Sequence, residues 1–313
     1  MSLPTRAVGD LTVSAIGLGC MPMSFPEAVD SRDRSLATIH RALDLGITFL
    51  DTSDIYAPTW DAVGHNERLV AEALRTYSGP ADVASVVVTT KGGITRGPDE
   101  TWGRDSSPGG LRAACEASLA ALEVDVIELY QHHRHDPRLT YREQMRTLRA
   151  LMDDGLVRRV GLSNVTAPEL AVAIEEVGGP ADGGIVSVQN EWSPRFRGEA
   201  DVLEECTRLG IAFLPWSPLG GSTQAHEIGD RYRDFAQVGE EIGASAQEVV
   251  LAWLLATSPV MIPIPGATRP ITIDSIVRVC EVMLSLEQIA RLDATQPLME
   301  SMYPEDQPRS PLG

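Results

Sequence analysis

Residues 126–163, VIELYQHHRHDPRLTYREQMRTLRALMDDGLVRRVGLS, contain one complete structural unit of this chain. A short apolar run, Val126–Gln131, is followed by a polar loop, a helical pattern that opens at Thr140, and a second apolar run, Arg159–Ser163. Thr140 and Glu143 have the spacing of a capping box, which marks the start of a helix. The segment therefore predicts a strand, a helix and a second strand parallel to the first.

The same unit recurs along the whole chain. Eight short apolar runs alternate with loops and helical patterns: Ser14–Gly19, Thr48–Thr52, Val86–Thr90, Val126–Gln131, Arg159–Ser163, Ile185–Asn190, Ala212–Ser217 and Val260–Ile264. Nearly continuous apolar character is typical of strands that are buried on both faces. Eight strand–helix repeats with parallel connections close most naturally into a (β/α)8 barrel of the TIM type, in the α/β class.

An open, doubly wound sheet is the alternative architecture. Its first strand usually leads into a GxGxxG turn that opens a helix. Here Gly17 and Gly19 are followed by Pro22 instead of a third glycine, and no helical pattern starts there. The barrel is therefore the better interpretation.

Two additions lie outside the repeat. Thr5–Val8 and Leu11–Ser14, separated by a Gly-Asp pair, predict a β-hairpin that plugs the N-terminal mouth of the barrel. Two further helical patterns follow Pro270, and the Pro-rich end from Pro304 is expected to be loose. No linker or low-complexity segment divides the chain, so we expect residues 1–313 to form a single domain.

The charge and composition exclude several classes of function. Lys and Arg number 26 against 44 Asp and Glu, a net charge of −18, which disfavours nucleic-acid binding. The first ten residues contain no apolar core typical of a signal peptide, and prolines interrupt the apolar stretch Leu251–Ala267, so no membrane span is expected. Four cysteines without CxxC or zinc-like spacing are typical of a reduced, cytoplasmic protein.

Polar side chains stand at the ends of three successive strands. Asp51 and Tyr56 follow the second run, Lys91 follows the third, and His132 and His133 follow the fourth. Loops after the strands form the reactive face of such barrels. Any one of these residues alone is more often a cap or an ion-pair partner than a catalyst, but together they indicate a catalytic rim.

This set of side chains suits proton donation to a carbonyl oxygen. A tyrosine with an ordinary pKa of about 10 is a weak acid, and a nearby ammonium group makes it a better proton donor. A buried lysine needs an acidic partner. A neutral imidazole can hold the carbonyl oxygen by a hydrogen bond.

The sequence resembles the aldo-keto reductase superfamily over nearly its whole length. The matching segments are FLDTSDIYAP at 49–58, VVVTTKGG at 86–93, LYQHHRHDP at 129–137, VGLSNV at 160–165, SVQNEWS at 187–193, WSPLGG at 216–221 and IPIPGATR at 262–269. The chain is most similar to the bacterial branch related to the voltage-gated potassium-channel β-subunits. The resemblance implies an enzyme that reduces aldehydes or ketones by hydride transfer. The rival implication is a cofactor-sensing subunit with slow turnover.

The resemblance places the family's catalytic tetrad on Asp51, Tyr56, Lys91 and His133. It implies that Tyr56 is the general acid, that Lys91 tunes its pKa, and that Asp51 pairs with the lysine. His133 would orient the carbonyl group. Alternation along the strand favours His133 over His132 for this role.

The family binds NADPH across the mouth of the barrel. The resemblance implies that Ser163, Asn164 and Gln189 hold the nicotinamide carboxamide, and that Trp216 stacks on the ring. The remaining matched positions are Ser217, Leu219 and Gly220 for the pyrophosphate and Gly266 and Arg269 for the 2′-phosphate. Because Thr268 and Ile276 replace a lysine and an asparagine common in relatives, NADPH is expected but NADH stays possible.

Two tryptophans and a pair of histidines are candidates for a substrate pocket and for a metal site. Trp60 and Trp102, in the loops after the second and third strands, fit either loop packing or the wall of an apolar pocket. His133 and His135 have a metal-ligand spacing, yet beyond them only His226 remains, in a loop, so no metal is expected. The expected partner is a small aldehyde or ketone, and the oligomeric state is left open.

Overall fold

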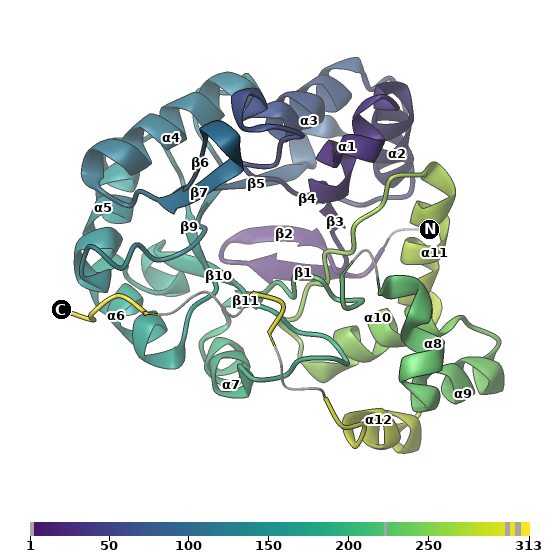
Figure 1. Ribbon diagram of the computed structural model, residues 1–313. Coiled ribbons are helices and arrows are strands. Elements are labelled where there is room, and N and C mark those ends of the chain that lie inside the picture. Colours follow the sequence, from purple (N-terminus) through teal and green to yellow (C-terminus); the bar gives the residue numbers. More distant parts are fainter. Residues whose placement is uncertain (1–2, 222–223, 298–300, 304–307) are drawn as a thin grey trace.

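Parallel strands form the inner wall of the protein in a computed structural model that describes residues 3–221, 224–297, 301–303 and 308–313. Neighbouring strands follow the chain order in one seven-stranded sheet. The strands are β3 (Leu18–Gly19), β4 (Phe49–Asp51), β5 (Val87–Gly92), β8 (Leu129–His132), β9 (Val160–Ser163), β10 (Ile185–Gln189) and β11 (Ala212–Phe213). Figure 1 shows them curling into a ring. The expected barrel is confirmed.

The eighth expected strand, Val260–Ile264, is not a regular strand but still closes the ring. On one side the Ile262 amide donates to the Phe213 carbonyl at 2.8 Å. On the other side the Gly17 amide donates to the Pro263 carbonyl at 2.8 Å. Proline has no N–H to donate, so this segment makes too few ladder bonds to count as a strand.

Helices surround the ring (Figure 1). The outer layer consists of α2 (Arg32–Asp44), α3 (His65–Thr76), α4 (Pro108–Leu122), α5 (Tyr141–Asp153), α6 (Ala167–Val177), α7 (Ala200–Leu209), α9 (Arg233–Ile242) and α10 (Ala246–Thr257), with short α1 (Pro26–Val29) and α8 (Ile228–Arg231). The capping box expected at Thr140 is present, and two more begin α6 at Thr166 and α10 at Ser245. Each satisfies backbone N–H groups that a helix start leaves unpaired.

The expected plug is also present. Strands β1 (Thr5–Val8) and β2 (Leu11–Ser14) form an antiparallel hairpin that lies across the ring in Figure 1. Val8 and Val13 are fully buried in one apolar cluster with inward-facing residues of the barrel strands, among them Phe49, Leu129 and Val186. Because the hairpin fills this end of the barrel, the opposite rim is left to hold a site.

The two C-terminal helices are α11 (Pro270–Arg278) and α12 (Leu286–Asp293). A second hairpin, β6 (Ile94–Gly97) with β7 (Thr101–Arg104), was not expected and follows β5. Within the described ranges, no helix is long and apolar enough to cross a lipid bilayer.

The expectation of a loose Pro-rich end is wrong for its last residues, whereas residues 304–307 lie outside the described part of the chain. The Tyr141 amide donates to the Pro311 carbonyl at 2.7 Å, and the Arg142 amide to the Leu312 carbonyl at 3.1 Å. Ser310 is buried. The first amides of α5 have no partner inside their own helix, so the tail fastens to the protein by satisfying them.

Candidate active site

Three neighbouring parallel strands deliver their polar residues to one rim. Asp51 ends β4, Lys91 lies near the end of β5, and His133 directly follows β8. The register pairs Asp51 with Thr89 and Lys91 with Gln131, so Lys91 lies two residues beyond the level of Asp51, and His133 two residues beyond the level of Lys91. These even offsets place the three residues on the same face of the sheet. Side chains that are 40 or more residues apart in the chain therefore face one another.

The Lys91 ammonium group is the centre of the rim. The side chain is fully buried, and Nζ lies 2.8 Å from Asp51 Oδ2, 2.8 Å from the Thr52 carbonyl oxygen and 3.2 Å from the Tyr56 hydroxyl. These three acceptors match the three N–H groups of an ammonium. A buried charge this well paired is tolerated where an isolated one would not be.

Burial and charge act in opposite directions on Tyr56. Burial raises the pKa of the Tyr56 phenol to about 12 and Asp51 adds to this rise, although Lys91 acts to lower it. For Lys91, burial lowers the pKa, but Asp51 and Tyr56 outweigh it and the net shift is upward. Lys91 thus acts in the expected direction, but in this structure burial dominates. The phenol holds its proton at neutral pH.

His133 faces Tyr56, and its neighbour His132 does not. The His133 and Tyr56 rings meet edge to face with centroids 5.9 Å apart. Burial, followed by the charge of Lys91, holds the pKa of His133 well below its usual value, so the ring is neutral. His132 lies on the other side of the strand, where Nε2 is 2.8 Å from Ser106 Oγ. Alternation along the strand predicted this difference.

A chain of hydrogen bonds joins the rim to the residues expected to bind a carboxamide. Gln189 Nε2 donates to Asp51 Oδ1 at 2.7 Å, and Ser163 Oγ donates to the Gln189 carbonyl at 2.8 Å. Asn164 Nδ2 donates to Ser163 Oγ at 2.8 Å, while Asn164 Oδ1 accepts from Trp216 Nε1 at 3.0 Å. The structure therefore brings all four of these predicted residues together.

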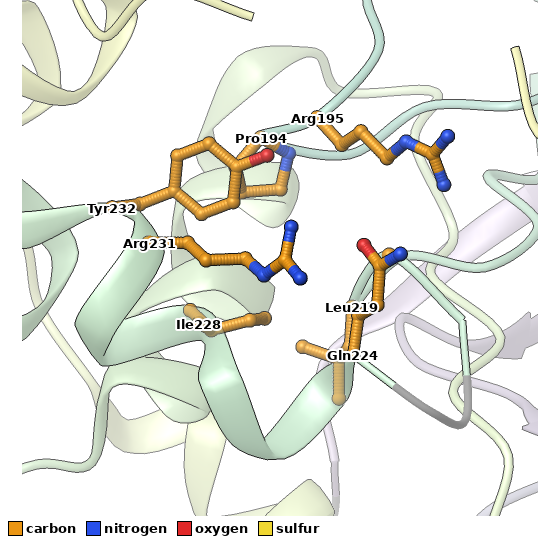
Figure 2. Close-up of a pocket in the computed structure, with 8 residues that line it drawn as sticks. Pro194, Arg195, Leu219, Gln224, Ile228, Arg231 and Tyr232 are labelled. Carbon is orange, nitrogen blue, oxygen red and sulfur yellow. The ribbon is translucent and has the colours of Figure 1, made fainter. Parts of the chain in front are cut away.

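The next predicted segment, Ser217 to Gly220, forms a tight turn. The Gly220 amide donates to the Ser217 carbonyl at 2.8 Å, and both residues have positive φ values of 75° and 48°. Leu219 and Gly220 line a pocket shown in Figure 2, where the polar ends of Arg195, Arg231 and Gln224 face the same space.

Arg195 was not predicted from the sequence. Its Nε is buried without a hydrogen-bond partner in the part of the chain that the structure describes. A buried donor left unpaired is unusual and indicates a missing acceptor. The only signal in the sequence was its place directly after the NEWSP stretch at 190–194. Arg231, also missed, is paired with Glu227 at 2.6 Å.

Gly266 and Arg269 lie beside the opening of the ring. Gly266 pairs with Gly19 in an isolated bridge, and a Cβ at position 266 would lie only 2.6 Å from Cγ of Pro22. Close packing therefore requires a glycine at position 266. Arg269 is exposed and directly precedes α11.

The two tryptophans proposed for a substrate pocket are both exposed, Trp60 in the segment between β4 and α3 and Trp102 in strand β7. Trp60 is 41% exposed and Trp102 is 57% exposed, with the Arg96 guanidinium 5.0 Å from the Trp102 ring centroid. Arg96 also donates to the Pro58 carbonyl at 3.2 Å, which ties hairpin β6–β7 to the loop after Tyr56. Loop packing is thus visible, and a substrate-facing role stays a prediction.

Tyr303, from the C-terminal segment, was also missed. Its ring centroid lies 5.4 Å from that of Trp216, and the Arg134 guanidinium lies 5.1 Å from the Tyr303 ring. Glu191 holds this segment by accepting from Ser301 Oγ and the Met302 amide, both at 2.9 Å. Its sequence carries no periodic pattern, so only the tertiary structure could place it near the rim.

The histidines with metal-like spacing have other partners. His135 Nδ1 lies 3.1 Å from Ser310 Oγ, and His133 contacts Ser53. Across the described ranges, no group of three or more His, Cys, Asp or Glu side chains is arranged to hold a metal ion.

Comparison with known proteins identifies the class of this barrel. The profile of the Aldo/keto reductase family matches residues 15–297. An uncharacterized oxidoreductase of Schizosaccharomyces pombe is 35% identical over 295 residues, covering 92% of this chain and 89% of that protein. Pyridoxine 4-dehydrogenase of Escherichia coli is 32% identical over 306 residues, covering 94% and 98%. The chain therefore belongs to the aldo/keto reductase family.

Solved structures share the fold. An aldo-keto reductase from Klebsiella pneumoniae in complex with NADPH superposes with a TM-score of 0.77 at 23% identity, covering 95% of this chain and 96% of that one. The glycerol dehydrogenase of Gluconobacter oxydans gives a TM-score of 0.77 at 24% identity, covering 94% and 95%. At this level of identity, the likeness shows a common architecture.

Proposed function

We propose that this protein is an NADPH-dependent reductase that converts aldehyde or ketone carbonyls to alcohols. The observation that carries the proposal is the 3.2 Å contact between Lys91 Nζ and the Tyr56 hydroxyl, in a site that also holds Asp51. We assign the chain to the branch related to the potassium-channel β-subunits and treat it as one barrel domain. Family membership supports the reaction class.

The residues at the rim fit a nicotinamide cofactor, which when bound supplies hydride to the carbonyl carbon. Ser163, Asn164 and Gln189 offer polar groups for its carboxamide, and Trp216 offers a flat apolar face. The Nε of Arg195, which has no hydrogen-bond partner among the described residues and lies beside Leu219 and Gly220, suits an anionic group such as a pyrophosphate. Arg269 would hold a 2′-phosphate, which favours NADPH over NADH.

In this mechanism Tyr56 donates its proton to the carbonyl oxygen as that oxygen gains negative charge. Lys91 stabilises the phenolate left behind, since its ammonium already contacts the hydroxyl. Asp51 keeps the ammonium paired throughout. His133, neutral and edge-on to Tyr56, donates a hydrogen bond that orients the carbonyl group.

The substrate class has one pointer. The relative from Escherichia coli, at 32% identity over nearly its full length, is named for the oxidation of pyridoxine. We therefore place pyridoxal beside simple aldehydes and ketones as a candidate substrate. Trp60 and Trp102, tied near the loop that follows Tyr56, are proposed as part of its pocket.

A cofactor-sensing subunit is the second candidate, favoured by the branch resemblance. Steady-state oxidation of NADPH and NADH over a panel of aldehydes, ketones and pyridoxal separates the two functions. Turnover above about 1 s⁻¹ on some carbonyl, within the ordinary range of enzymes, is the expected result. Tight NADPH binding with negligible turnover across the panel would favour the sensing function instead.

A further inference from the structure

Ser53 Oγ is a branch point of hydrogen bonds behind the rim. Ser53 is fully buried in the loop after β4. Its Oγ lies 2.9 Å from Asp54 Oδ1, 3.2 Å from His133 Nδ1 and 3.5 Å from the Lys91 carbonyl oxygen. A hydroxyl carries one proton, so only one of these three neighbours can receive it at a time.

When the carboxyl of Asp54 is ionised, it is the strongest of these three acceptors for the proton of the Ser53 hydroxyl. Its carboxyl is buried, and Oδ1 also accepts the Ile55 amide at 2.7 Å. A carboxylate accepts a charge-assisted bond, which is about twice as strong as a neutral one. When Asp54 is protonated that advantage is lost, and the basic imidazole nitrogen becomes the better acceptor.

We propose that Ser53 is a positioning residue that couples the charge of Asp54 to the choice of the ring nitrogen that carries the proton of His133. The inference rests on the proposed reductase function, in which His133 makes a hydrogen bond to the substrate oxygen. Because Nδ1 faces Ser53, we assign that bond to Nε2.

The neutral and ionised states of Asp54 differ in whether Nε2 of His133 donates or accepts a hydrogen bond. With Asp54 neutral, Ser53 donates to Nδ1, the ring proton is on Nε2, and Nε2 donates to a carbonyl oxygen. With Asp54 ionised, Ser53 donates to the carboxylate, Nδ1–H donates to Ser53 Oγ, and Nε2 is an acceptor suited to an alcohol hydroxyl. The imidazole holds one proton in both states, and the proton lost to solvent is that of Asp54.

The groups around Asp54 place its change of charge within an accessible pH range. Its carboxyl is faced by Glu67 of α3, Lys91 of β5 and Tyr130 of β8. Burial, followed by Glu67, raises the pKa of Asp54 to about 8, against the opposing effects of its hydrogen bonds and Lys91.

The imidazole of His133 does not gain charge over the same range. It is faced by Lys91, Arg134, Arg104 and His132, and burial together with these groups holds the pKa of His133 well below its usual value. Asp54 can therefore change charge while the imidazole stays neutral.

Long-range ¹H–¹⁵N correlation spectra of the full-length, uniformly ¹⁵N-labelled protein test the proposal without cofactor or substrate. The His133 ring is identified as the signal that His133→Asn removes. In the wild type we expect the protonated nitrogen to change from Nε2 at pH 6.5 to Nδ1 at pH 9.5. In each of the variants Ser53→Ala and Asp54→Asn, the ring nitrogen that is protonated at pH 6.5 should still be protonated at pH 9.5.

Two variants act as controls. Ser106→Ala removes a serine–histidine contact of the same kind, to Nε2 of His132 at 2.8 Å, and should leave the response of His133 unchanged. Ser53→Thr keeps a hydroxyl and should restore the response that Ser53→Ala loses. A wild-type ring that keeps one tautomer over the pH range, or a Ser53→Ala ring that still switches, would overturn the proposal. Either failure leaves the reductase function to its own test, turnover of carbonyls.

Discussion

Gln189 donates a hydrogen bond from Nε2 to Asp51 Oδ1 at 2.7 Å, and so joins the buried ion pair to the residues proposed to bind the cofactor. Asp51 Oδ2 is meanwhile held by Lys91 at 2.8 Å. The carboxylate is therefore shared between the proton-donating group and the carboxamide site. A substitution that disturbs the proton-donating group should therefore also affect the carboxamide site, and the reverse.

Replacing Gln189 with Leu removes the closer amide donor to Asp51 Oδ1, because Gln131 Nε2 is 3.4 Å away. Leaving a buried charged acceptor underpaired should lower the free energy of unfolding by about 1–3 kcal/mol. NADPH binding should weaken as well. Urea unfolding and cofactor fluorescence titration measure the two effects, and a variant with wild-type stability would argue against the shared carboxylate.

Lys91→Met leaves Asp51 buried without its counter-ion. Breaking one side of a buried pair should cost about 3–5 kcal/mol of stability. The double variant Asp51→Asn/Lys91→Met carries no charge at either position and should recover part of that loss. Denaturant unfolding of the wild type, both single variants and the double variant checks this. Equal stability of the Lys91→Met variant and the double variant would contradict it.

Asp54 makes stability depend on pH with a defined sign. Its pKa rises from an ordinary value of about 3.9 to about 8 in the folded protein. Between these values the folded state binds more protons than the unfolded state, so this group lowers stability as pH rises from about 4 to about 8, by up to about 1.4 kcal/mol per pH unit. Asp54→Asn should flatten that part of the profile in urea unfolding. A variant profile parallel to that of the wild type would count against a buried, protonated Asp54.

The sequence predicted the barrel because its strands are buried on both faces and its helices begin at strong caps such as Thr140 and Ser245. The eighth strand was predicted but is irregular. An apolar pattern does not show that Pro263 and Pro265 lack backbone N–H groups. Hairpin β6–β7 escaped prediction because it lies in a polar loop with no clear alternation.

The sequence predicted the part of the candidate site that lies at strand ends. Strand-end residues such as Lys91 converge because parallel strands share a rim, and that follows from the repeat alone. Contacts made by irregular segments follow no such rule. Arg195, Tyr303 and the Ser53 branch point depend on loop paths that only the three-dimensional structure provides.

Replacing Arg269 should distinguish NADPH from NADH, whereas replacing Arg195 should not. Only NADPH carries a 2′-phosphate, so Arg269→Ala should weaken NADPH binding by about 10- to 100-fold, equal to about 1.4–2.8 kcal/mol, and leave NADH unchanged. Both cofactors carry a pyrophosphate, so Arg195→Ala should weaken both to a similar extent. Fluorescence titration of each variant with each cofactor gives the comparison. Equal losses for NADPH and NADH in Arg269→Ala would remove Arg269 from the 2′-phosphate site.

The central claim is that the Tyr56 hydroxyl, 3.2 Å from Lys91 Nζ, supplies the proton. The direct measurement is kcat of Tyr56→Phe with an aldehyde that the wild type reduces, together with its NADPH dissociation constant. Tyr77→Phe is the matched control, since Tyr77 also donates to a carboxylate, Asp44 at 2.7 Å, away from the rim. We predict that Tyr56→Phe lowers kcat by about 10²- to 10⁴-fold with cofactor affinity intact, and that Tyr77→Phe changes neither. A Tyr56→Phe enzyme that turns over within a few-fold of the wild type would contradict the account.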